Sequence, residues 1–227
     1  MDLFQRVSNQ VGLPRRGLWI ALYGPDGAGK SAVAEHLARE LAPCFSSVRQ
    51  HHLRAEFVSA RRVPVTVTQP HAQAPRGLLL SCPKLAYLLL HCWLAHVLLV
   101  LPRVAAGELV IFDRYFADYT IDTQRYRLPH GLSFWAEVLS RLAPRPDRQF
   151  VLDVPGLQLQ LRKHEVTLKE SLRQRQAYID ELGRAPNSRI VNADRPLSDV
   201  AAEIANEILR LLRERNASPA EADVARA

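Results

Sequence analysis

The chain has 227 residues, of which 48% are hydrophobic, which is enough to bury one sizeable α/β core. Its formal net charge of +7 suits anionic ligands; charge alone does not separate small phosphates from nucleic acid or an acidic membrane surface. The three cysteines, Cys44, Cys82 and Cys92, are an odd number without metal-ligand spacing. They argue against a disulfide framework and indicate a reduced, cytoplasmic compartment.

Residues 1–17 are expected to form a helical arm, because Leu3, Phe4, Val7 and Val11 make an apolar stripe. This start does not have the charged-then-apolar pattern of a signal peptide. We therefore expect the arm to dock on one main domain at 18–214, followed by a disordered tail at 215–227.

The most specific motif lies at residues 24–31, which read Gly-Pro-Asp-Gly-Ala-Gly-Lys-Ser and match G-x-x-x-x-G-K-[ST]. An apolar strand at 18–23 precedes it and a helical pattern at 32–41 follows, which predicts a phosphate-binding loop (P-loop) at a helix N-terminus. Lys30 is expected to reach the β- and γ-phosphates of ATP, and the Ser31 hydroxyl to bind Mg²⁺. The other expected nucleotide-binding residues of the loop are Gly24, Asp26, Gly27, Ala28 and Gly29.

A second strand is predicted at 45–53 and ends in His51 and His52, two possible contacts for a phosphoryl acceptor. A basic, proline-containing loop follows at 54–77. The next segment, Leu85–Leu101, has seventeen residues without a formal charge. It is short for a bilayer and contains two histidines, so we expect a helix buried in the core and no membrane span, with peripheral membrane contact left open.

A third strand at 109–112 delivers Asp113, Arg114 and Tyr115 to the carboxyl edge of the sheet, where ligands of open α/β sheets bind. The remaining elements are two strands, at 149–154 and 189–193, and helices at 115–126, 132–142, 157–163, 167–182 and 197–213. This alternation predicts an α/β chain with a three-layer P-loop NTPase fold: a parallel five-stranded sheet with helices on both faces.

The residues around the loop narrow the class of P-loop protein. A GTPase would carry N-K-x-D, which is missing, and the D-x-x-G match at 153–156 comes too late in the chain. A motor ATPase usually places a water-activating carboxylate after its second acidic strand, whereas here Arg114 follows Asp113. A cation at that position favours phosphoryl transfer to an organic acceptor.

At four places in order the chain resembles the thymidylate kinase family: the P-loop, Asp113-Arg114-Tyr115, a basic segment from Arg162 to Tyr178, and residues 190–197. The resemblance covers about 24–210 and implies an ATP- and Mg²⁺-dependent phosphotransferase with an arginine-bearing lid at about 162–176. It also implies a possible homodimer, because such relatives often pair through helices beside the sheet.

Transferring a phosphoryl group spreads charge that fixed cations stabilise. The expected catalytic residues are Lys30, Asp113, Arg114, Arg162, Arg173 and Arg175. Asp113 would hold Mg²⁺ together with Ser31. In the resemblance, Asp26 matches the loop acid that contacts a sugar hydroxyl of the acceptor, and Arg195 lies in the segment that packs the donor's adenine.

The acceptor half of the chain departs from the family pattern. The helix before Asp113 has no arginine in its interior, and Asp118 and residues 121–123 stand where the family has a serine and Ala-Tyr-Gln. Acceptor contacts are therefore expected from Asp26, Tyr115, Arg125 and Arg127. A nucleoside monophosphate such as thymidine monophosphate is the first acceptor hypothesis. A sugar or glycolipid acceptor, and a non-catalytic ATP-binding regulator, stay open; no nucleic acid partner is expected.

Overall fold

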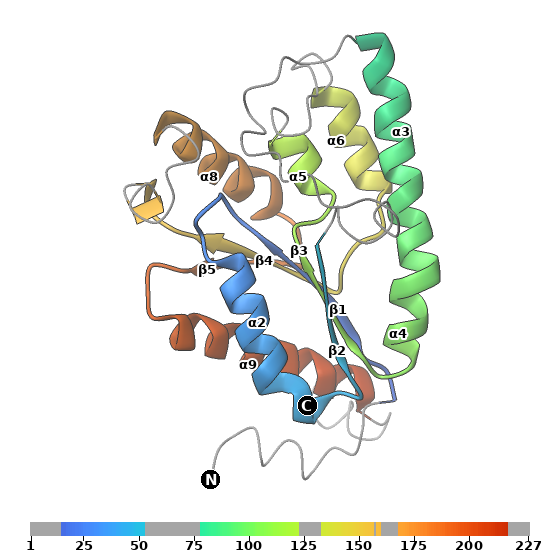
Figure 1. The fold of residues 1–227 in the computed structure, drawn as a ribbon, viewed down its shortest axis with the longest axis vertical. Helices are drawn as coiled ribbons and strands as arrows, with labels where there is room; N and C mark the ends of the chain where they lie inside the picture. Colours follow the sequence, from blue (N-terminus) through green and yellow to red (C-terminus); the bar gives the residue numbers. More distant parts are fainter. Residues whose placement is uncertain (1–14, 53–77, 123–132, 157, 160–167, 218–227) are drawn as a thin grey trace, which may run out of the picture.

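The computed structural model describes residues 15–52, 78–122, 133–156, 158–159 and 168–217, with the backbone alone at 78–82 and 133–137. Its described strands form one parallel sheet in the order β2-β3-β1-β4-β5, which confirms the predicted fold class (Figure 1). The strands are β1 (Leu18–Tyr23), β2 (Val48–His52), β3 (Leu109–Asp113), β4 (Arg148–Asp153) and β5 (Ser188–Asn192).

Helices cover both faces of this sheet (Figure 1). One face carries α2 (Lys30–Leu41) and α9 (Leu197–Asn216); a short 3₁₀ turn, η1 (Ala42–Cys44), follows α2. The helical elements of the other side are α3 (Leu78–Ala95), the π-helical η3 (His96–Val100), α4 (Leu101–Ala105), α5 (Ala117–Ile121), α6 (Ser133–Leu142) and α8 (Leu168–Leu182).

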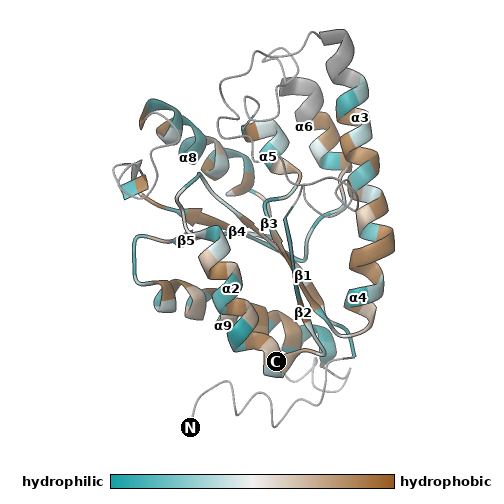
Figure 2. Cartoon of the chain, viewed as in Figure 1, coloured by the Kyte–Doolittle hydropathy of each residue, from teal (hydrophilic) through white to brown (hydrophobic). Residues whose placement is uncertain are grey.

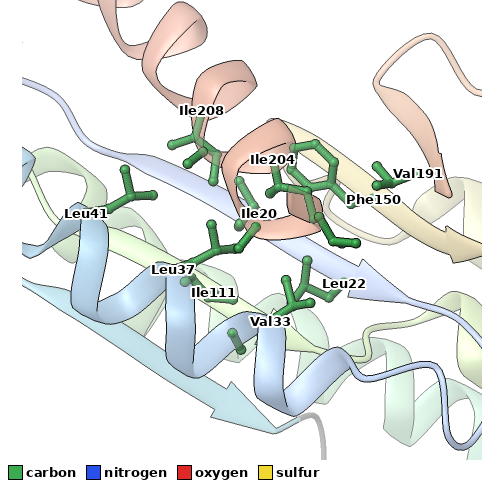
Figure 3. Close-up of a cluster of buried hydrophobic side chains, with 14 of the residues drawn as sticks. Ile20, Leu22, Val33, Leu37, Leu41, Ile111, Phe150, Val191, Ile204 and Ile208 are labelled. Atoms are coloured by element: carbon green, nitrogen blue, oxygen red, sulfur yellow. The ribbon is translucent and has the colours of Figure 1, made fainter. Parts of the chain in front are cut away.

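The larger apolar cluster lies between the sheet and the pair α2 and α9 (Figure 3). Ile20 and Leu22 of β1 point into it, where they meet Leu37 of α2 and Ile204 and Ile208 of α9. Each such fully buried Leu or Ile side chain contributes roughly 1.5–3 kcal/mol relative to an exposed one. This packing fixes the start of α2 at the end of β1 and so holds the loop between them.

The helical stretch from α3 through η3 to α4 is only partly buried, so the prediction that Leu85–Leu101 is a buried core helix is wrong for one face. Leu85, Cys92 and Val100 pack against the sheet, but Leu98 is 63% exposed. The other exposed apolar side chains of this stretch are Tyr87, Leu90, Trp93, Leu94, Val97 and Leu101. Figure 2 shows apolar residues over much of its length. An 18-residue window within Pro83–Ala105 has a mean hydropathy of 1.9, so by length and composition alone this stretch could cross a membrane; a core helix can meet the same test.

Several predicted boundaries differ from those of the structure. The segment predicted as a helix at 115–126 contains only one short helix, α5, in its described part. β2 begins at Val48, not at 45, because Phe45 is part of the apolar cluster after η1. Most of the arm at 1–17, the loop at 54–77, nearly all of the predicted helix at 157–163 and most of the tail at 215–227 lie outside the described residues.

Candidate active site

The P-loop turns tightly between β1 and α2, and three of its glycines have positive φ: 139° at Gly24, 87° at Gly27 and 86° at Gly29. L-residues with a side chain rarely adopt these angles, which explains the glycines. A Cβ on Gly24 would lie 2.8 Å from the carbonyl oxygen of Leu152 in β4, so this position also needs a bare backbone. A Cβ on Gly29 would meet no atom within 4 Å. The open side of the loop at Gly29 therefore leaves room for a phosphate at the N-terminus of α2.

Lys30 is the first residue of α2 and is only 6% exposed. Its ammonium donates hydrogen bonds to the carbonyl oxygens of Gly24 and Pro25, at 2.7 and 2.8 Å. Burial, helped by the nearby Arg114 charge, lowers the pKa of Lys30 to about 8, although Asp26 and Asp113 act in the opposite sense. At neutral pH the side chain is therefore mainly charged, and an anion placed against it would be stabilised.

Asp113 ends β3 beside the P-loop, because Leu22 of β1 pairs with it in the sheet register. Its Oδ2 accepts a hydrogen bond of 2.6 Å from the Ser31 hydroxyl. Its Oδ1 is buried and has no hydrogen-bond partner among the described residues. A hydroxyl and a carboxylate with a free oxygen at a P-loop are donors that Mg²⁺ accepts, so the residues present fit this ion.

Arg114 has a φ of 74° and is the one non-glycine residue with positive φ in the described part of the chain. Its guanidinium, 4% exposed, donates to Asp26 of the P-loop and to Asp118 of α5, in the second case at 2.6 Å. Tyr178 of α8 donates to the other Asp118 oxygen at 3.0 Å. Burial opposes the charge of Arg114, but Asp118, Tyr178 and Asp26 together raise the pKa of its guanidinium above its ordinary value.

These groups line one cavity of about 200 Å³ at the carboxyl edge of the sheet. Its lining includes Asp26, Lys30, Ser31, Asp113 and Arg114. His52 also lines it, because β2 pairs with β3 so that His52 lies opposite Asp113. A cavity of about 330 Å³ between α5, α6, α8 and β4 is larger, but it contains none of the P-loop residues. The smaller cavity is the candidate active site because the cations, the carboxylates and the P-loop meet there.

Six described residues of the predicted site do not line this cavity: Gly24 and Ala28 of the P-loop, Tyr115, Arg173, Arg175 and Arg195. Tyr115 is 3% exposed and packs edge-on against Trp19 and Phe112, so its ring belongs to the core on the far side of the strand and lines the larger cavity. Burial is the main cause that raises the pKa of its hydroxyl. The structure thus gives Tyr115 a packing role in place of the predicted acceptor contact, because two residues after β3 its side chain is buried in the apolar cluster with Trp19 and Phe112.

The three predicted site arginines that the structure describes outside the cavity are held by carboxylates. Arg175 of α8 forms two hydrogen bonds with Asp153 at the end of β4, at 2.5 and 2.8 Å. Arg173 pairs with Glu170 on its own helix and donates to the Ile121 carbonyl oxygen at 2.9 Å.

Arg195 of the predicted adenine segment donates to Glu203 and to the Asn192 carbonyl oxygen. Arg125, Arg127 and Arg162 lie outside the described residues.

Sequence reasoning did not identify Asp118 and Tyr178 as neighbours of the site. The i,i+4 spacing of Arg114 and Asp118 was the available signal, but it required a helix to continue from the strand end. Asp153 was considered only as a D-x-x-G match, whereas in the structure it binds Arg175. His51 contacts Arg103 at 2.8 Å, so of the two histidines considered, only His52 lines the cavity.

Comparison with protein-family models gives no match. The chain is 27% identical over 199 residues to a probable thymidylate kinase of Thermococcus gammatolerans, which covers 83% of this chain and 94% of that protein. It is 29% identical over 212 residues to a thymidylate kinase of Bordetella petrii, covering 86% and 97%. A thymidylate kinase of Xanthomonas euvesicatoria is 37% identical over 142 residues, but this match spans 61% of the chain and 57% of the relative.

Solved structures share the fold. A thymidylate kinase of Candida albicans superposes with a TM-score of 0.63 at 17% identity, over 86% of this chain and 92% of that one. The enzyme of Ehrlichia chaffeensis gives 0.61 at 19% identity, over 85% and 99%. The chain is thus similar in sequence to thymidylate kinases over most of its length and shares the fold of solved thymidylate kinases, and its P-loop and Asp113-Arg114 pair meet at one cavity.

Proposed function

We propose that the chain transfers the γ-phosphoryl group of ATP to a nucleoside monophosphate such as thymidine monophosphate. The observation that carries this proposal is the meeting of Lys30, Ser31, Asp113 and Arg114 on one cavity at the N-terminus of α2. The names of the curated relatives support the choice of acceptor. An acceptor phosphate is already ionised, so the reaction needs positioning and charge stabilisation but no general base.

We assign Mg²⁺ binding to Ser31 and Asp113. The buried Asp113 Oδ1 atom without a partner supports this assignment, as does its contact with the Ser31 hydroxyl. When bound, Mg²⁺ would neutralise charge on the phosphate oxygens during transfer. The two protein oxygens leave room for several waters, as Mg²⁺ commonly requires.

The cations of the site stabilise the transferred group. Lys30 would exchange its two carbonyl partners for phosphate oxygens, since its amine already lies against the loop. Arg114, which lines the same cavity, would contact the acceptor phosphate. The glycines and Ala28 would supply backbone amides.

The remaining predicted roles concern the lid and the two substrates. Arg173 and Arg175 would reach the phosphates if the lid helix gave up their present carboxylate partners; Arg162 is assigned with them by analogy alone. We keep Arg195 as a contact of the adenine. Arg125 and Arg127 remain proposals as acceptor contacts, together with Asp26, which lines the cavity.

Labelled ATP and Mg²⁺ incubated with a panel of nucleoside monophosphates, nucleosides and sugars test the proposal, with Lys30→Met as the inactive control. Label transferred to thymidine monophosphate by the wild type, and reduced at least about 10²-fold in the variant, supports it. Transfer only to sugars would identify the chain as a hydroxyl kinase. Saturable ATP binding without transfer to any acceptor would identify a regulatory binding protein.

We further propose a homodimer formed through the exposed apolar face of α3, η3 and α4. Tyr87, Leu90, Leu94 and Leu98 recur at helical spacing along it and are about half exposed or more. Exposed patches of this kind mark interaction sites. From Leu85 to Leu101 this face has no formal charge that could contact lipid headgroups. A second copy of the chain is therefore a better partner for the face than a membrane. Light scattering that gives twice the mass of one chain supports the dimer; a monomer that binds anionic vesicles supports membrane contact.

We also propose a cytoplasmic location. The described cysteines Cys44 and Cys92 are free and buried, and burial raises the pKa of the Cys92 thiol to about 12. Thiols of this kind are typical of reduced compartments. Fractionation of cells that express the full chain checks this proposal.

A further inference from the structure

The cluster that holds Arg114 contains one more negative charge than positive charge. Asp118 accepts from Nη1 of Arg114 at 2.6 Å, and Asp26 accepts from its Nη2. The side chains of Arg114, Asp26 and Asp118 are 5%, 9% and 0% exposed. Water therefore screens these charges poorly, and each carboxylate affects an ion in the adjoining cavity.

The two carboxylates differ in what they can do when a substrate arrives. Asp26 lies in the P-loop and lines the cavity, so it can turn toward a substrate. Asp118 lies in the short helix α5, four residues after Arg114. The Tyr178 hydroxyl of α8 donates to the second carboxylate oxygen of Asp118 at 3.0 Å. Both oxygens of Asp118 are thus bound by buried partners, and this carboxylate stays against Arg114.

The charge of the whole site follows from these contacts. Lys30 and Arg114 bring two positive charges, and Asp26, Asp113 and Asp118 bring three negative ones. An Mg²⁺ ion offsets the charge near Asp113, but Arg114 remains compensated by Asp118 at a distance of one hydrogen bond. A phosphate that approaches Arg114 is therefore attracted less than it would be by a guanidinium without a fixed counter-ion.

We propose that Asp118 is an acceptor-specificity residue, whose buried carboxylate weakens the binding of a doubly charged acceptor phosphate at Arg114. The site then binds the phosphate of a monophosphate acceptor less tightly than it would without the Asp118 charge. This inference rests on the proposed function, because it takes the cavity beside Arg114 to be the acceptor site. Asp118 acts through Arg114 and does not itself touch the acceptor.

The test uses the purified full chain with Mg²⁺ and ATP, and compares the wild type with Asp118→Asn. The amide oxygen can still accept from Arg114, and the amide nitrogen, in place of the second carboxylate oxygen, can donate to the Tyr178 hydroxyl oxygen, but the side chain carries no charge. Its KM for thymidine monophosphate is expected to fall by about tenfold while kcat changes by less than about threefold. Glu181→Gln is the matched control: it removes one carboxylate from α8, where Glu181 accepts from Thr120 and not from Arg114. This control should leave KM unchanged.

Calorimetric binding of thymidine monophosphate and of thymidine separates charge from structure. Asp118→Asn should tighten binding of the monophosphate and leave binding of the nucleoside unchanged, whereas a merely structural role would weaken both. A KM that rises or stays constant, or an equal change in Glu181→Gln, overturns the inference. If the asparagine variant does not fold, Asp118→Ser gives the same comparison.

The proposed function can fail separately from this inference. If the wild type transfers no label to thymidine monophosphate, the calorimetric comparison still decides the role of Asp118. In that case tighter monophosphate binding by Asp118→Asn supports the inference, and unchanged or weaker binding contradicts it.

Discussion

Replacing Arg114 with alanine should lower the free energy of unfolding by about 3–5 kcal/mol, because it removes the cation between the buried Asp118 and the partly buried Asp26. Asp118 is 0% exposed, so it cannot recover its lost partner by turning to water. The left-handed backbone at residue 114 gives no compensation, since alanine is strained there as well. For a chain of this size the midpoint of thermal unfolding should fall by roughly 6–20 °C.

Urea denaturation followed by tryptophan fluorescence and by circular dichroism measures this loss, and coincident curves justify a two-state analysis. In the Asp118→Asn background, Arg114→Ala should cost at least about 2 kcal/mol less than in the wild type, because the uncompensated charge is gone. Arg184→Ala, an exposed arginine of the segment after α8, is the control and should stay within about 0.5 kcal/mol of the wild type. A loss below about 1 kcal/mol for Arg114→Ala, or an equal loss in both backgrounds, would refute this reasoning.

Three further predictions concern the loop, acid stability and assembly. Gly29→Ala should cost only about 1 kcal/mol of stability for its φ of 86°, but it should weaken Mg²⁺-ATP binding at least about tenfold by calorimetry. Gly24→Ala should lose more stability, because its Cβ would meet the β4 backbone at 2.8 Å. A larger stability loss for Gly29→Ala than for Gly24→Ala would contradict the loop geometry. Hydrogen bonding from Arg210 holds the pKa of Glu207 below about 4.5. The stability that the ionised Glu207 carboxylate contributes to the fold is therefore present above that pH and is lost as the pH falls through the lowered pKa. Wild type should therefore lose more stability than Glu207→Gln between about pH 5 and pH 3 in urea titrations, and parallel losses would count against the ion pair. Leu98→Glu should halve the mass found by light scattering without changing the circular dichroism spectrum. A variant that remains dimeric would show that the dimer interface does not include this face.

The sequence was sufficient to predict the fold and the centre of the site because those depend on local patterns. The P-loop motif fixed the junction of β1 and α2, and the apolar run before Asp113 placed that carboxylate at the sheet edge. Glycine spacing and strand hydrophobicity are read over a few residues, and the parallel sheet then brings the strand ends together.

The partners of the site arginines could not be predicted in the same way. Arg175 and Asp153 are 22 positions apart, and Tyr178 and Asp118 are 60 apart. These contacts depend on how α8 packs over α5 and β4, and many pairings of a basic helix with nearby carboxylates have similar energies.

The exposed face of α3 was misjudged for a different reason. A helix that is apolar on all sides looks buried on all sides, and only the packed structure shows which side the sheet covers.

Calorimetric titration of ATP into the full chain, with and without Mg²⁺, is the most direct test of the account. We predict one saturable site per chain that requires Mg²⁺ and is weakened at least about tenfold by Ser31→Ala, because the Ser31 hydroxyl and Asp113 are assigned to the metal. Folded protein that takes up no ATP under either condition, or that binds it equally without Mg²⁺ and in Ser31→Ala, would contradict the account.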